Sequence, residues 1–248
     1  FHPKLRRDDI FWADLMETEA EQPMPRNIPT IEGGDVLLPR RDLIVVGISE
    51  RTNRAGVETL LKALRSENAG VENAIIVEIP RQRSFMHLDT IFTFISANEC
   101  LLYPPVLLPS GSQAAKVSSV DLTKKRSLAF SAQKSLLGAL KKFDIDLEPI
   151  FCGGAQAVDQ QREQWTDGAN AFALAPGVIL GYERNVRTAE ALAKQGYDIV
   201  YEDDVLLGRT ELELWTDKKY AIQIAGNELS RARGGPRCMT MPLEREDL

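Results

Sequence analysis

Histidine and cysteine, the residues best suited to proton transfer and nucleophilic attack, are scarce in this sequence. Its 248 residues include two histidines, His2 and His87. His87 lies in the segment MHLDTIFTF, whose β-branched and aromatic residues are typical of a strand. On a strand, His87 and Asp89 would point to the same side, and a carboxylate beside an imidazole raises the imidazole pKa so that it can carry a proton. The alternative is a histidine with a purely structural role.

The three cysteines differ in their surroundings. Cys238 follows SRARGGPR, where two glycines, a proline and three arginines predict an electropositive loop. Positive charge favours thiolate over thiol, so Cys238 is a candidate nucleophile. Cys100 and Cys152 lie in or beside apolar residues and fit the role of small buried hydrophobic residues, which is also the alternative for Cys238.

Two carboxylates, Glu32 and Asp35, lie in EGGD, where paired glycines allow a tight turn or a close approach to a ligand. The alternative is a charged turn ahead of a strand. The dispersed histidines and cysteines give no zinc-ligand spacing, and the sequence has neither GxGxxG nor a P-loop. A thiolate nucleophile needs a proton donor for its leaving group, and carboxylates around it suit a cationic substrate. A guanidinium group fits, because its planar N–H fork pairs with carboxylates.

Repeated hairpin–helix units are expected to position these residues. Residues 31–67 predict two strands joined by a Pro-Arg-Arg-Asp turn and then an amphipathic helix, and residues 167–196 repeat this order. A third hairpin is expected within residues 86–104, with a helix around Ser131–Phe143. The two first units align at Gly47/Gly181, Glu50/Glu183, Arg51/Arg184, Asn53/Asn185 and Glu58/Glu190. Such repetition predicts an α/β fold built as a propeller-like array.

Composition and charge exclude several classes of protein. With 44% hydrophobic and 27% charged residues the chain should form a globular core. A net charge of −6 argues against a nucleic-acid partner, and the apolar stretches 43–48 and 100–108 are too short to span a membrane. Dispersed cysteines without CxxC favour a reducing compartment, so we expect a cytoplasmic location. Residues 1–30, with four prolines, are expected to be a connecting segment, and the first residue, Phe1, suggests part of a longer protein.

Several motifs together resemble the arginine deiminases, within the guanidine-modifying superfamily. In chain order they are IEGGDVLL, GISERT, RSFMHLDTIFTF, REQWTDGAN and SRARGGPRCMTMPL, of which MHLDT and GGPRCMTMPL are specific signals. The resemblance runs from Phe1 to the end of the chain. It implies one catalytic domain over residues 1–248, folded as a five-module α/β propeller (pentein) of ββαβ-type repeats whose first module is absent or incomplete.

The resemblance also implies the chemistry. Cys238 would attack the guanidinium carbon of free L-arginine to form a covalent thiouronium intermediate. His87 would protonate the departing ammonia and then activate water, which gives L-citrulline. Glu32 and Asp89 match carboxylates that hold the guanidinium nitrogens.

Three further residues match positions that bind or support the substrate. Arg51 and Arg233 match arginines that neutralise the substrate α-carboxylate, and Asp35 matches a supporting residue. The resemblance implies neither a metal nor an organic cofactor, and it implies a homo-oligomer.

One feature of the family is not in the sequence. A further carboxylate in a Phe-x-Arg-Asp motif, another arginine and a helical insertion would precede the region that matches FHPKL. Because losing a buried partner of a guanidinium costs on the order of several kcal/mol of transition-state binding, we expect the chain alone to be inactive or strongly impaired. The alternatives are an arginine dihydrolase or another guanidine deiminase, and a non-catalytic arginine-binding protein on the same scaffold. Arg51 and Arg233 argue against agmatine, and a binding protein would need no thiol.

Overall fold

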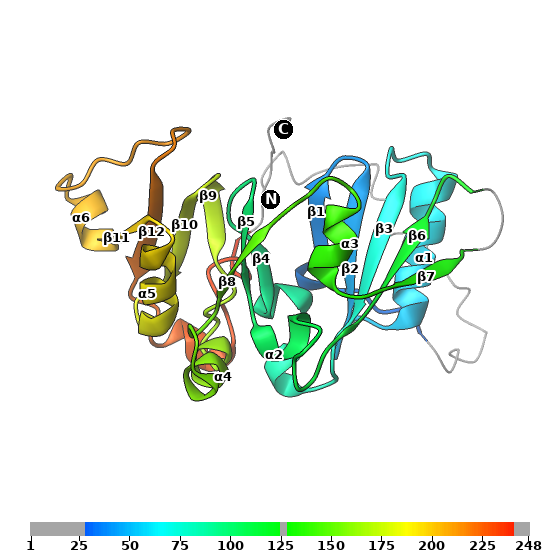
Figure 1. Ribbon diagram of the computed structural model, residues 1–248, viewed down its shortest axis with the longest axis horizontal. Coiled ribbons are helices and arrows are strands. Elements are labelled where there is room, and N and C mark those ends of the chain that lie inside the picture. Colours follow the sequence, from blue (N-terminus) through cyan, green and yellow to red (C-terminus); the bar gives the residue numbers. More distant parts are fainter. Residues whose placement is uncertain (1–27, 125–127, 241–248) are drawn as a thin grey trace, which may run out of the picture.

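Three β-sheets lie side by side in the computed structural model, which describes residues 28–124 and 128–240 (Figure 1). The connecting segment expected over residues 1–30 falls outside the described residues except for 28–30. Within the described part, no helix is long and apolar enough to cross a membrane.

The first sheet has the order β1-β2-β3-β6-β7. Its strands are β1 (Val36–Arg40), β2 (Leu43–Ile48), β3 (Asn73–Glu78), β6 (Lys116–Asp121) and β7 (Phe130–Gln133). The parallel strands β2 and β3 are joined by helix α1 (Arg54–Ser66), which begins after Asn53, whose side chain accepts the main-chain N–H of Gly56. All residues of β2 are buried, because alternate side chains enter two different apolar clusters on the two faces of the sheet.

The second and third sheets follow along the chain. The second consists of β4 (Phe92–Phe94), β5 (Glu99–Leu102) and β8 (Glu148–Phe151). The third, at the left of Figure 1, has the order β11-β12-β10-β9 and consists of β9 (Phe172–Ala175), β10 (Val178–Tyr182), β11 (Tyr197–Tyr201) and β12 (Lys219–Ile224). The other helices are α2 (Pro104–Leu107), α3 (Leu136–Lys141), α4 (Ala157–Trp165), α5 (Val186–Lys194) and α6 (Glu202–Leu206).

The repeat predicted from the sequence is confirmed. An antiparallel hairpin precedes α1 in the first sheet and α5 in the third, and β4 and β5 form the third expected hairpin. Gly47 and Gly181 lie in the second strand of their hairpins, and Asn53 and Asn185 directly precede the helices. The fold is therefore mixed α/β, with several open sheets among the described residues.

Two local predictions are wrong. Of the strand expected around His87, only β4 is extended, and Leu88–Thr90 forms a short 3-10 helix, η5. The main-chain N–H of Leu88 donates to the remote side chain of Asp35, which turns the chain away from sheet pairing. The strand alternation that would place His87 and Asp89 on one face therefore does not apply.

The helix expected around Ser131–Phe143 is shorter than predicted. Its first residues belong to β7, which pairs antiparallel with β6, and α3 begins only after Ser135, which accepts the N–H of Gly138. Three further 3-10 helices are η3 (Gly33–Asp35), η4 (Arg83–Phe85) and η6 (Leu229–Ala232).

Candidate active site

Glu32 and His87 meet where two 3-10 turns approach each other. Glu32 directly precedes η3, and His87 directly precedes η5. The His87 Nε2 atom lies 2.5 Å from Glu32 Oε2, and the His87 side chain is 17% exposed. The ring also packs against Gly34, where a Cβ would lie 2.7 Å from His87 Cγ. The structure thus brings these two predicted residues into direct contact.

The side chain of Asp35 connects the two turns. It is fully buried, its Oδ1 accepts the Leu88 N–H at 2.8 Å and its Oδ2 accepts the Ser49 hydroxyl at 2.6 Å. Burial raises the pKa of Asp35, and the hydrogen bonds from Ser49 and Leu88 oppose that shift. Asp35 therefore holds η3 and η5 together, in keeping with the supporting role expected for it.

Cys238 and Asp89 form the second half of the site. Cys238 Sγ lies 3.7 Å from Asp89 Oδ2 and 3.9 Å from Oδ1. Burial raises the pKa of Asp89, while the nearby charges of Arg237 and His87 lower it. His87 is close enough to Asp89 for its charge to affect the Asp89 pKa, and it also contacts Glu32. The four residues expected to be catalytic therefore lie in one region.

The thiol of Cys238 is not electrostatically activated in this structure, contrary to the expectation of a thiolate. Cys238 is an exposed residue, but protein atoms around the sulfur and the Asp89 carboxylate raise the pKa of the thiol to about 12. Arg237 opposes this shift without cancelling it. Cys100 and Cys152 are buried, as expected of structural cysteines.

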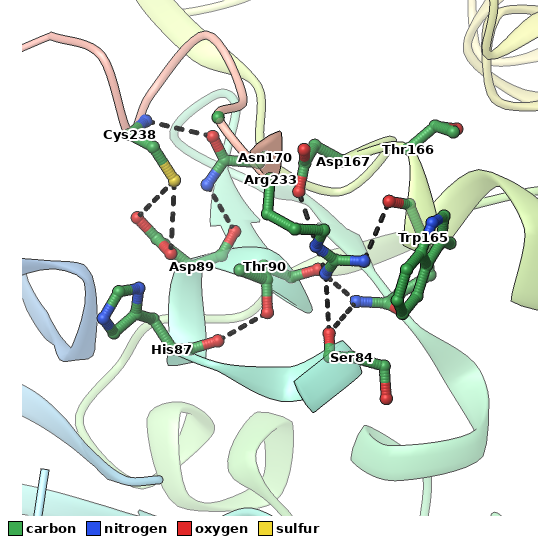
Figure 2. A network of polar contacts seen from close by, with 12 residues as sticks. Ser84, His87, Asp89, Thr90, Trp165, Thr166, Asp167, Asn170, Arg233 and Cys238 are labelled. Atoms are coloured by element: carbon green, nitrogen blue, oxygen red, sulfur yellow. Dashed lines mark hydrogen bonds and ion pairs between the residues drawn. The ribbon is translucent and has the colours of Figure 1, made fainter. Parts of the chain in front are cut away.

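Asn170 connects the segments that carry Asp89 and Cys238, a role that the sequence analysis did not assign to it. Its Oδ1 accepts the main-chain N–H groups of Arg237 and Cys238 at 3.1 Å each. Its Nδ2 donates to the Asp89 carbonyl at 2.9 Å, and Figure 2 shows Asn170 between Cys238 and Asp89. A side chain at Gly235 would collide with Asn170. The motif TDGAN was visible in the sequence, but Asp, Gly and Asn are common in turns, which hides such a residue.

The two candidate arginines lie in different surroundings. Arg51 is half-exposed, with Nη1 at 4.0 Å from Glu32 Oε1, so it borders the Glu32–His87 contact. The Arg233 guanidinium is 3% exposed and donates to the carbonyls of Trp165 at 2.8 Å and Ser84 at 2.7 Å. Figure 2 shows it beside these residues, apart from the Cys238–Asp89 contact. The structure therefore does not present Arg233 to the nucleophile.

Another arginine, Arg237, occupies the site instead. Its Nη1 lies 2.7 Å from Asp89 Oδ2, and Asp89 is 1% exposed. The carboxylate beside the nucleophile thus holds a guanidinium group of the chain itself. Among the described residues, no group of three or more His, Cys, Asp or Glu side chains could hold a metal ion.

Comparison with protein families and curated sequences gives a consistent result. The family model described as arginine deiminase matches residues 1–245. The arginine deiminase of Bacillus thuringiensis subsp. konkukian (strain 97-27) is 32% identical over 252 residues, covering 100% of this chain and 53% of that protein. The arginine deiminase of Listeria monocytogenes serotype 4a (strain HCC23) is 33% identical over 261 residues, covering 100% and 57%. The chain spans about half the length of these relatives.

Solved structures resemble this chain at the level of the fold. An amidinotransferase of saxitoxin biosynthesis from Microseira wollei has a TM-score of 0.53 at 16% identity, covering 89% of this chain and 49% of that one. An inosamine-phosphate amidinotransferase from Streptomyces griseus has a TM-score of 0.52 at 12% identity, covering 92% and 51%. The ternary complex of AgrE with ornithine and NAD+ has a TM-score of 0.52 at 15% identity, covering 90% and 24%.

Proposed function

Because this chain belongs to the arginine deiminase family, we propose that it supplies the catalytic residues of an enzyme that hydrolyses free L-arginine to L-citrulline and ammonia. The observation that supports this function most directly is the position of Asp89. Its Oδ2 lies 2.7 Å from the guanidinium of Arg237 and 3.7 Å from Cys238 Sγ. A carboxylate that binds a guanidinium beside a thiol is what attack on a guanidinium carbon requires.

Substrate binding would replace Arg237 on Asp89 with the guanidinium of arginine, and Glu32 would hold the other nitrogens. Burial and the negative charge of Asp89 raise the pKa of Cys238 to about 12 in the free chain. The substrate carries the same charge as the Arg237 side chain that it replaces, but its guanidinium carbon would lie directly against the sulfur. The thiol therefore passes its proton to His87 more readily once the substrate is bound. Its sulfur attacks the guanidinium carbon and forms a C–S bond.

His87 would manage the protons of both half-reactions. It donates a proton to one terminal nitrogen, the C–N bond breaks, and ammonia leaves a thiouronium intermediate on Cys238. His87 then accepts a proton from a water molecule that attacks the same carbon. The C–S bond breaks, citrulline is released, and the Cys238 thiolate takes back a proton from His87. One water is consumed for each ammonia formed.

The remaining predicted residues would bind or support the substrate. We assign Arg51 to the α-carboxylate, since it is half-exposed beside Glu32. Asp35 supports the two turns that present Glu32 and His87. The resemblance also matches Arg233 to the α-carboxylate, but its buried guanidinium favours a different role. We expect neither metal nor organic cofactor in the reaction.

The complete enzyme would be larger than this chain. The hairpins β1–β2, β4–β5 and β9–β10 lie in three different sheets, and we propose that they belong to three modules of a five-module pentein. A further acidic residue would come from outside these residues, as the shared length with relatives suggests. We place the enzyme in the cytoplasm as a homo-oligomer, without a nucleic-acid or membrane partner.

A citrulline assay tests the proposal. The chain is measured alone and together with the N-terminal half of a family member, with arginine as substrate and both citrulline and ornithine quantified. We expect citrulline only from the completed enzyme, and Cys238→Ala should abolish it while arginine binding, measured by calorimetry, survives.

The matched control is Cys100→Ala, which removes a buried thiol outside the site. Citrulline formation by Cys238→Ala would refute the assignment of Cys238 as the nucleophile. Arginine binding without citrulline in any form of the protein would favour the non-catalytic alternative, and ornithine as product would identify a dihydrolase.

A further inference from the structure

Arg233 and Asp167 are two charged side chains buried together near the site. Their side chains are 3% and 0% exposed, and Arg233 Nη2 lies 3.9 Å from Asp167 Oδ1. Both Asp167 carboxylate oxygens and Arg233 Nε are buried without a hydrogen-bond partner in the described structure. Buried charges are costly unless they are compensated, so each of these groups depends on the other.

Arg233 also connects three separate parts of the chain. It directly follows η6 in the loop that leads to Cys238, and its guanidinium donates to the carbonyl of Ser84 in η4 and to that of Trp165 at the end of α4. The same group stacks on the Trp165 ring at 4.6 Å (Figure 2). Its side chain is thus the point at which the loop is attached to two other elements.

The backbone at Arg233 needs such an attachment. Its φ of 65° is left-handed, a conformation that costs an arginine on the order of 1 kcal/mol and is usually taken by glycine. The turn places the following residues so that the main-chain N–H groups of Arg237 and Cys238 reach Asn170. The side-chain contacts of Arg233 offset the cost of this turn.

We propose that Arg233 and Asp167 form a positioning pair that holds the Cys238 loop in place before the substrate binds. Arg233 fastens the loop to Ser84 and Trp165, and Asp167 supplies the negative charge that stabilises a buried guanidinium. The pair keeps Cys238 beside Asp89. The importance of this pair for catalysis rests on the proposed function, in which Cys238 is the nucleophile.

The reactivity of Cys238 provides a test that needs neither substrate nor activity. Cys238 is the exposed thiol of the three, because Cys100 and Cys152 are buried, so iodoacetamide should alkylate it selectively. The rate is measured by mass spectrometry at neutral pH without arginine. When the loop detaches, the sulfur leaves the Asp89 carboxylate and becomes more accessible, so alkylation accelerates.

We expect Arg233→Gln to accelerate alkylation about tenfold, because it loses the buried charge pair and the charge-assisted hydrogen bonds. Arg233→Lys should give an intermediate rate, since lysine keeps the charge but lacks the planar fork. Asp167→Asn should accelerate alkylation about fivefold, and combined with Arg233→Gln it should add less than about twofold, because coupled residues are not additive.

The matched control is Arg231→Gln. Arg231 lies in the same loop, but it is 73% exposed and paired with the exposed Glu228, so its loss should change the rate by less than about twofold. If Arg233 served only to bind the substrate carboxylate, Arg233→Gln would leave the rate in the absence of arginine unchanged. That result, or fully multiplicative effects in the double variant, would overturn the positioning pair.

The buried cysteines report whether a variant still folds. Labelling of Cys100 and Cys152 would indicate global unfolding of a variant. In that case the alkylation rates of Arg233→Lys and Asp167→Asn, which change the side chains less, test the proposal. A failure of the citrulline assay would refute the proposed function and leave these rates unaffected, so the two proposals fail separately.

Discussion

At the scale of single residues, burial and the charge of Asp89 raise the pKa of the proposed nucleophile, Cys238. Asp89 holds the Arg237 guanidinium at 2.7 Å and faces the Cys238 sulfur at 3.7 Å. In the free chain the carboxylate helps to raise the pKa of the thiol to about 12, so the thiol is largely protonated at neutral pH. In the proposed reaction the substrate guanidinium would lie closer to the sulfur than Arg237 does, so it would favour the thiolate more strongly.

Replacing Asp89 with asparagine should lower the pKa of Cys238 by about one unit or more, since a negative charge beside the thiolate is removed. The pH dependence of iodoacetamide alkylation measures this shift, and at pH 8 the rate should rise about tenfold. The control is Glu228→Gln, which removes an exposed carboxylate from the Cys238 loop. An alkylation profile identical to that of the unaltered chain would contradict the assignment.

The sequence identified the chemical groups of the site better than their electrostatics. The resemblance carried by MHLDT and GGPRC selected His87, Asp89 and Cys238, whereas the residues alone left a structural role open for His87 and Cys238. Three arginines before Cys238 predicted an activated thiolate, yet one is buried under Trp165, one pairs with Glu228, and one is held by Asp89. Charge sign can be read from a sequence, but distance and desolvation decide a pKa, and both depend on the tertiary structure.

At the scale of elements, the two 3-10 turns η3 and η5 act as one unit. Asp35 from the first turn accepts the N–H of Leu88 from the second, and Glu32 meets His87 across them. The hairpins and helices around this unit were predictable, because their apolar periodicity is local. The turn at Leu88 was not, because the carboxylate that captures its N–H is remote in sequence. Strand β7 was missed for a related reason, since β6 recruits it into the first sheet.

This unit makes a sharp prediction at Gly34. In Gly34→Ala the new Cβ would lie 2.7 Å from His87 Cγ, so the imidazole must move away from Glu32. Citrulline formation by the completed enzyme should fall at least about tenfold, because small displacements of a proton donor are costly. The adjacent Gly33→Ala is the control, since its Cβ meets nothing within 4 Å. Equal activity of the two variants would argue against a fixed position for His87.

At the scale of the whole molecule, the buried Asp167 makes stability depend on pH. Burial, opposed by the charge of Arg233 and assisted by that of Asp89, raises its pKa from 3.8 to about 6. The folded chain therefore binds this proton more tightly than the unfolded chain. The contribution of this group to stability is complete below pH 3.8 and is lost as the pH rises through about 6.

Urea denaturation of the unaltered chain and of Asp167→Asn at several pH values measures this effect. Between pH 4 and pH 7 the free energy of unfolding of the unaltered chain should fall relative to that of the variant by about 2 kcal/mol, since this window covers most of the raised pKa. Because both chains share all other titrating groups, the difference isolates Asp167. A difference that does not change with pH would show that Asp167 is ionised equally in both states.

The order in which the sheets use the chain has a consequence for biosynthesis and gene architecture. The first sheet uses residues 36–133 and the second uses residues 92–151, so their strands interleave, whereas the third sheet draws only on residues 172–224. During synthesis, β3 and β5 emerge before their partners β6 and β8, so each has an unpaired edge until the later strand is made. A break within residues 109–115 would separate strands from their partners in two sheets. Residues 152–156 are instead a natural joint, where a gene could be split or fused while every described strand keeps its neighbours.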